Sequence, residues 1–138
     1  MPASTYLANK LLDHVLRGVA YTPPTKVYVS LHTGDPGLTG ANEVTTGAWP
    51  AYAREEASQG GAVGTGFEVA AAKATSNALE MLWAANDGAS TITLTHFGLW
   101  DAATGGNFLG GDALTASKTI GVTDETVIHA NTLDVDLT

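Results

Sequence analysis

At 138 residues, the chain has the length of one ordinary domain, and we expect a single β-sandwich domain that spans residues 1–138. Its net charge of −8 comes from 14 acidic and 6 scattered basic residues, so neither nucleic acid nor an anionic membrane surface is an expected partner. The absence of Cys excludes disulfides, and no apolar run is long enough to predict a membrane span or a signal peptide.

The composition favours β structure. Only 14% of the residues are charged, against about 25% in a typical soluble domain, so other residue types must cover the surface. The chain contains 19 Thr and 16 Gly. Because Thr suits the exposed face of a pleated sheet and Gly supplies tight turns, these residues indicate a turn-rich, mostly β protein.

One helix is predicted at about residues 5–17, between a capping Ser4 or Thr5 and a terminating Gly18. Apolar residues form two adjacent rows at helical spacing, and polar residues occupy the opposite side. The rows are Leu7, Leu11 and Val15, and Ala8, Leu12 and Leu16, with Lys10, Asp13, His14 and Arg17 opposite. We expect this helix to lie against a larger body and cover an open end of the β core; docking onto a partner is the alternative.

Residues 26–33 alternate between two sets of side chains and predict a half-buried strand. Val27, Val29 and Leu31 are expected to point inward, and Tyr28, Ser30 and His32 outward. The turn Gly34-Asp35-Pro36-Gly37 closes this strand.

The loop at residues 38–50 has no periodicity, and a loop of this length in a compact domain is more often functional than idle. Aromatic residues are enriched at interface anchors. We therefore take Trp49, with Pro50 and Tyr52, as the candidate contact with a partner protein. Packing of Trp49 against the protein's own sandwich is the alternative, and Trp83 and Trp100 are expected in the core because their surroundings are apolar.

The middle of the chain is ambiguous. A short strand is predicted at 52–57 and a Gly-rich loop at 60–66. The Ala-rich stretch 69–85 suits a helix by propensity, whereas Leu79, Met81 and Trp83 would share one face of a strand. Both readings stay open.

The second half predicts strands at 91–100, 107–109, 118–122 and 126–129, and a last one that ends at residue 137. In the last strand Leu133, Val135 and Leu137 are expected to point inward. Seven or eight short strands with frequent turns indicate an all-β fold, a jelly-roll type β-sandwich with one N-terminal helix.

No catalytic constellation or metal site is predicted. The four His residues are far apart in sequence and have no carboxylate at ligand spacing, and no Ser lies in a nucleophile elbow. Asp134 and Asp136, with Asp101 or Asp124, would be the residues of a calcium site, but nothing resembles a calcium-binding loop. We expect no enzymatic activity, no cofactor and no metal.

Two stretches resemble a known family. Residues 5–16 with 27–36, and residues 95–107 with 114–118, are similar to the two halves of a family of small virion proteins of tailed phages. Members of that family are often labelled tail fibre proteins, and within it the likeness is to capsid cement (decoration) proteins of phage heads. The resemblance implies a jelly-roll domain that clamps neighbouring capsid subunits, and it leaves out residues 59–89.

The expected function is therefore that of a structural virion protein on the outer surface of a phage head. The major capsid protein is the expected partner, and a homodimer is the favoured oligomer because a self-complementary twofold contact is the simplest assembly. The alternative is a tail fibre or tail adaptor protein that contacts a host glycan. Neither long repeats nor a stalk are present in the sequence, and a fibre usually has them.

Overall fold

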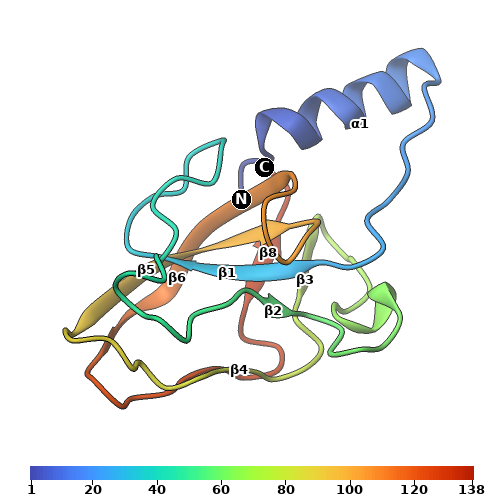
Figure 1. The fold of residues 1–138 in the computed structure, drawn as a ribbon. Coiled ribbons are helices and arrows are strands. Elements are labelled where there is room, and N and C mark those ends of the chain that lie inside the picture. Colours follow the sequence, from blue (N-terminus) through green and yellow to red (C-terminus); the bar gives the residue numbers. More distant parts are fainter.

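A computed structural model describes residues 1–138 as a β-rich body with a helix that projects from it (Figure 1). The helix is α1 (Thr5–Arg17), and a short 3-10 helix is η1 (Val63–Thr65). The strands are β1 (Tyr28–His32), β2 (Glu55–Glu56), β3 (Ala74–Ser76), β4 (Met81–Trp83), β5 (Ile92–Trp100), β6 (Phe108–Ile120), β7 (Thr126–Ile128) and β8 (Asp134–Asp136).

The strands form one larger antiparallel sheet and two small ones. The larger sheet has the order β2-β1-β5-β6, and the small sheets pair β3 with β8 and β4 with β7. Strands far apart in sequence are thus neighbours in space, as in a jelly-roll type sandwich. The predicted fold class, an all-β sandwich with one N-terminal helix, is confirmed.

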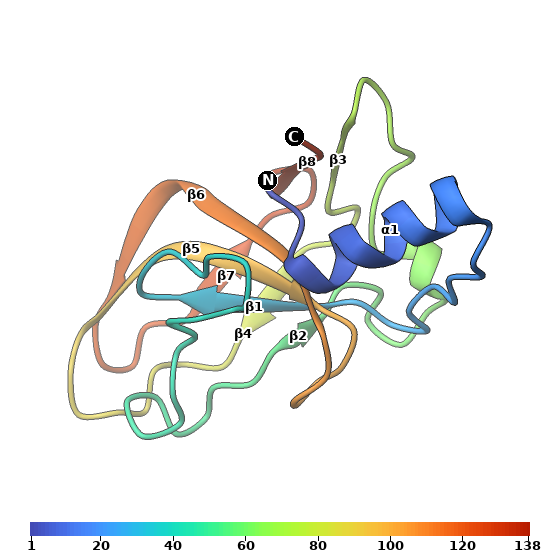
Figure 2. The same cartoon turned by 90° about the horizontal axis from the view of Figure 1, so that it is seen from above.

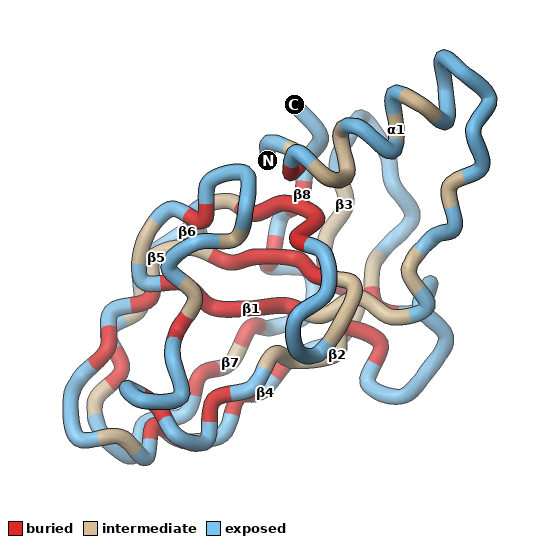
Figure 3. Tube along the Cα trace, turned by 45° about the horizontal axis from the view of Figure 1, so that its top comes forward, coloured by how far each residue is buried: buried red, intermediate tan, exposed pale blue.

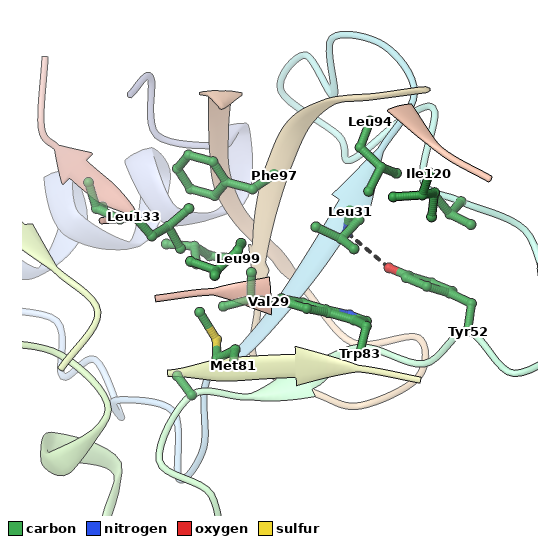
Figure 4. Close-up of a cluster of buried hydrophobic side chains, with 14 of the residues drawn as sticks. Val29, Leu31, Tyr52, Met81, Trp83, Leu94, Phe97, Leu99, Ile120 and Leu133 are labelled. Atoms are coloured by element: carbon green, nitrogen blue, oxygen red, sulfur yellow. Dashed lines mark hydrogen bonds between the residues drawn. The ribbon is translucent and has the colours of Figure 1, made fainter. Parts of the chain in front are cut away.

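The core lies between the larger sheet and the small sheets (Figure 4). It includes side chains of β1, β4, β5 and β7, and the loop residues Trp49 and Tyr52. Met81 and Trp83 on β4 are almost fully buried, whereas Leu82 between them is 52% exposed. This alternation is that of a strand, so the strand reading of residues 79–83 holds.

The Ala-rich stretch before β4 is a turn and not a helix. Ala72 and Lys73 have φ angles of 52° and 67°, in the left-handed region, and Ala71 pairs with Ala74 across the turn. The pairing of β3 with β8 holds one arm of this turn, and the Phe67–Asn77 bridge holds the other arm against it. Tertiary pairing has overridden the helix propensity of Ala here.

The strand β1 is buried on both faces, so the prediction of a half-buried strand is wrong. Val29 and Leu31 face the core, but Ser30 and His32 on the other face are also fully buried. Side chains of Trp100 and Phe108, and the loop that contains Ala41, cover that second face. The covering residues come from distant parts of the chain, which local alternation cannot reveal.

The strand β5 contains an irregularity that changes which of its side chains are buried. Leu94 pairs with Lys118 and His96 with Ala113, so Leu114–Ser117 of β6 stand opposite the single residue Thr95. Before this bulge Ile92 and Leu94 lie in the core, and after it Phe97 and Leu99 do. Such a bulge breaks the strict alternation of buried and exposed side chains that a regular strand has.

The last strand is shorter than expected. Leu133 and Val135 are buried as predicted, but Leu137 lies beyond β8 and is 48% exposed. The two short strands expected at 107–109 and 118–122 are the ends of the single long strand β6.

Candidate functional site

The first turn of α1 is held firmly to the body. Ser4 is buried and caps the helix, with its Oγ 3.0 Å from the amide of Leu7 that donates to it. The Ser4 amide donates to the Leu109 carbonyl at 2.9 Å, and Ala3 pairs with Gly110 of β6. Tyr6 and Leu7 then pack against the core. The helix therefore starts from a fixed position on the edge strand β6.

The end of α1 is closed by its own local contacts. Gly18 adopts a φ of 68°, and its amide donates to the Asp13 carbonyl, which is the usual helix stop. The His14 Nδ1 lies 2.8 Å from the Val19 carbonyl, and Arg17 pairs with Asp13 at 3.1 Å. Residues 18–25 then return to β1 along the outside of the body (Figure 1).

The far half of α1 exposes an apolar row. Leu12, Val15 and Leu16 are 57%, 73% and 75% exposed, and Val19 directly after the helix is 45% exposed. The expectation that α1 covers an open end of the β core is wrong for this half, because the helix leaves the body after its first turns (Figure 1). We call Leu12, Val15, Leu16 and Val19 the apolar row of α1.

An exposed apolar row on a short helix indicates a binding surface. An isolated helix of this length is only marginally stable in water, and most helices are stabilised by packing of their apolar face. Within the helix, Leu12, Val15 and Leu16 have the i, i+3, i+4 spacing of a helix that lies in a groove of a partner. Neither α1 nor η1 has the length and hydrophobicity of a membrane-spanning helix.

The charges of α1 differ from those of the body. The helix holds Lys10, Asp13 and Arg17, a net charge of +1, which leaves −9 for the rest of the chain. Lys10 lies 5.8 Å from the centre of the Tyr6 ring, and Arg17 is 69% exposed at its side chain. The apolar row thus projects, with cations beside it, from an acidic body.

The candidate anchor Trp49 lies in the protein's own core. Its side chain is fully buried, its ring packs on Tyr52 with a centroid distance of 5.5 Å, and its Nε1 donates to the Ala85 carbonyl at 3.0 Å. In this conformation Trp49 has no surface that a partner could contact, so the self-packing alternative describes its position. Pro50, next to it, is exposed, and contact of a capsid with Pro50 remains a prediction.

Tyr52 is also buried, at 8% exposure, and takes part in an internal polar cluster. Its hydroxyl donates to Glu43 and accepts a hydrogen bond from the Leu31 amide, both at 3.0 Å. Burial raises the pKa of Tyr52 well above its usual value. Glu43 in turn binds Arg54 through both of its carboxylate oxygens, at 2.9 Å and 2.8 Å.

Arg54 connects the long loop that contains Glu43 to the turn that contains Ala102 and Gly105. Besides Glu43, its guanidinium donates to the Ala102 and Gly105 carbonyls and stacks on the Trp100 ring at 3.6 Å. The long loop that contains Trp49 therefore has a structural task, which the sequence pattern did not reveal.

No three His, Cys, Asp or Glu side chains lie close enough together to hold a metal ion. The carboxylates considered for calcium have separate partners: Asp101 accepts from Asn107, and Asp124 accepts from the Gly121 amide. That the protein needs no cofactor or metal stays a prediction.

The comparisons with known proteins place the chain among phage virion proteins. A family model described as podophage GP4 fiber I protein gp80 matches residues 2–136. The search of curated proteins found no match. The family match agrees with the resemblance to small virion proteins of tailed phages, but it does not extend to capsid cement proteins.

Proposed function

The chain belongs to the podophage GP4 fiber I protein gp80 family, and from this premise we propose that it is a cement protein of the outer head surface. In this role it clamps neighbouring major capsid subunits. Membership of the family makes it a structural protein of a phage particle, and the location on the head is the proposed part.

The observation that carries the proposal is the apolar row of α1 on a helix with a fixed start. A helix whose first turn is bonded to β6 presents Leu12, Val15 and Leu16 in one defined direction. Such a preorganised element loses little conformational entropy when it binds. It suits an apolar groove between capsid subunits, where burial of these side chains gives the affinity.

The negative charge of the body supports a location on the outer surface of the shell. A charge of −9 outside the helix is repelled by packaged DNA, which carries one negative charge per about 1.7 Å of duplex. The compact fold, without a stalk, also suits a protein that lies flat on a shell. As part of the proposal we retain a twofold dimer, because a dimer with two helices spans two capsid subunits and makes the second contact effectively intramolecular.

The test is reconstitution on particles that lack the protein. A variant that carries Leu12→Asp and Leu16→Asp should leave the melting temperature of the free protein nearly unchanged and abolish its occupancy on the particles. Val69→Asp is the matched control, because Val69 is 92% exposed but lies outside α1. Electron microscopy of the reconstituted particles gives the location and copy number, and hundreds of copies on the head support cement.

Two outcomes contradict the proposal. Occupancy equal to that of the control would remove α1 as the attachment element. A variant that stays bound to particles but loses its dimer in sedimentation analysis would instead assign the row to contact between two copies of the chain.

A tail fibre or tail adaptor is the second candidate, and the specific observation that favours it is the description of the matched family as a fiber protein. It predicts a few to a few tens of copies, all on the tail. A host glycan would then be the ligand, and glycan binding by the purified protein would favour this candidate.

A further inference from the structure

The body has a second exposed apolar feature, a groove beside the edge strand β6. The groove has a volume of about 490 Å³ and lies between β6 and the segment that joins β7 to β8. Core side chains form its floor, among them Phe97, Ile128 and Leu133. Leu114 and Ala116 of the β6 bulge form one wall.

The outer edge of β6 beside this groove is not paired with another strand of the protein. The strand β6 is the last strand of its sheet, and only its start is covered, by Ala3 and Ser4. No backbone hydrogen bond joins residues 112–119 to any segment other than β5. Because Leu114–Ser117 stand opposite Thr95 alone, part of their backbone is also unpaired on the inner side.

The charges at the groove indicate which occupant fits. Lys118 donates to the Val127 carbonyl at 2.8 Å, and the His129 Nδ1 lies 2.7 Å from a Glu80 carboxylate oxygen, so both side chains already have a partner. Asp134 lines the groove and has neither an ion pair nor a side-chain hydrogen bond. With the −9 charge of the body, this favours an occupant with a Lys or Arg near Asp134.

We propose that this groove binds an extended, positively charged segment of a neighbouring virion subunit, which adds to β6 and places alternate apolar side chains against Leu114 and Val127, the partly exposed apolar residues of the lining. Main-chain hydrogen bonds to an unpaired edge, with alternate side chains in pockets, are the usual features of strand addition. A single flexible segment can follow the bulged edge, whereas the bulge disrupts the straight edge that pairing with a second copy's sheet needs.

The inference rests on the proposed function and supplies its second contact. In Figure 2, α1 extends from one end of the molecule, and the part of β6 beyond its start lies toward the other end. A protein that clamps two subunits needs two separate surfaces. The apolar row of α1 and the β6 groove would then hold different subunits, with the avidity that two linked contacts give.

The test uses the full chain, particles that lack it, and a matched pair of variants. Ala116→Trp fills the groove, whereas Ser117→Trp places the same side chain at the next residue of the bulge, which does not line the groove. We expect Ala116→Trp to dissociate from particles at least about tenfold faster than Ser117→Trp. Equal dissociation rates for two variants with unchanged melting temperature would overturn the inference.

Hydrogen exchange of the unmodified protein gives an independent measurement that does not depend on the folding of a variant. Amides 114–116 should exchange at least about tenfold more slowly on particles than in the free protein. Exchange equally fast in both states overturns the inference, and protection that rises with the concentration of the free protein overturns it in favour of a second copy. Occupancy lost in the α1 variant alone, with both groove measurements unchanged, would leave the proposed function intact and remove only the groove contact.

Discussion

The body and the helix α1 differ in the burial of their apolar residues. In the body, Trp49, Trp83 and Leu31 are fully buried, and loops that lack secondary structure are held by internal hydrogen bonds. In the far half of α1, Leu12, Val15 and Leu16 are mostly exposed (Figure 3). Residues of similar hydrophobicity therefore stabilise the fold in one region and remain available for binding in the other.

The difference separates stability from attachment. Loss of a buried apolar side chain leaves a cavity and lowers the free energy of unfolding, whereas loss of an exposed one barely changes it. Variants of the two regions should accordingly affect melting temperature and particle occupancy in opposite proportions. The following predictions test that contrast in order of expected size.

The largest effect is expected for Trp49→Ala. The side chain is fully buried in the core, and its Nε1 bond to Ala85 would also be lost. We expect a loss of about 3–5 kcal/mol in the free energy of unfolding and a fall in Tm of more than about 10 °C. Thermal unfolding measures it, with Pro50→Ala as the exposed neighbour. A stable Trp49→Ala variant with reduced occupancy would restore Trp49 as a contact with the capsid.

A smaller loss is expected for Arg54→Ala. It leaves the partly buried carboxylate of Glu43 without its bidentate partner and frees the carbonyls of Ala102 and Gly105. We expect about 2–4 kcal/mol of destabilisation in denaturant unfolding. Arg54→Lys should recover only part of it, since an ammonium cannot form the two parallel hydrogen bonds. Full recovery by Lys would mean that charge alone matters here.

A pH effect is expected from His32. The His32 Nδ1 lies 2.7 Å from the Ala41 carbonyl and must donate to it, so Nε2 accepts from Ser30 at 2.7 Å in the neutral ring. Ser30 in turn accepts from the Trp100 Nε1 at 2.9 Å. Protonation of Nε2 would turn it into a donor, so the Ser30 hydroxyl would lose the acceptor for its own hydrogen.

Burial lowers the pKa of His32, and the nearby His96 and Arg54 lower it further, against the opposing Ala41 carbonyl and Glu43. Since the folded pKa lies below the unfolded value of about 6.5, the unfolded chain binds the proton first. The stabilisation is complete above about pH 6.5 and is lost as the pH falls toward the folded pKa, by up to about 1.4 kcal/mol per pH unit. Unfolding at pH 7.5 and 5.5 should show a smaller pH dependence in His32→Gln. An equal dependence would assign it to other groups.

The smallest effect on stability is expected in the apolar row of α1. Leu12→Gln and Leu16→Gln replace exposed side chains by polar ones of similar length and helix propensity. Each should change the free energy of unfolding by less than about 0.5 kcal/mol. Leu7→Gln is the control within the same helix, because Leu7 packs on the core and its replacement should cost more. A large loss at Leu16 would mean that the row contacts the body.

Local sequence signals predicted where helices and strands lie better than they predicted what packs against them. Ser4 and Gly18 mark the ends of α1, because caps and stops act within a turn of helix. The face of β4 with Met81 and Trp83 was visible in the sequence as one of two readings, and the pairing of β4 with β7 decided between them. The groove beside β6 was not visible at all, since the bulge that forms one of its walls is defined by the register of two strands.

By itself, the sequence determined the fold class and the position of the helix. It also showed that the four His residues of the protein are far apart along the chain. Capping, alternation and turn residues are properties of neighbours in the chain. Only the tertiary structure decided which faces are covered. In the structure His32 and Trp49 are buried, the Ala-rich stretch forms a turn and not a helix, and the apolar row of α1 is exposed. The physical reason is that the burial of a residue depends on which distant segments of the chain pack against it. Two residues in the same local sequence pattern can therefore lie in the core in one case and in solvent in the other.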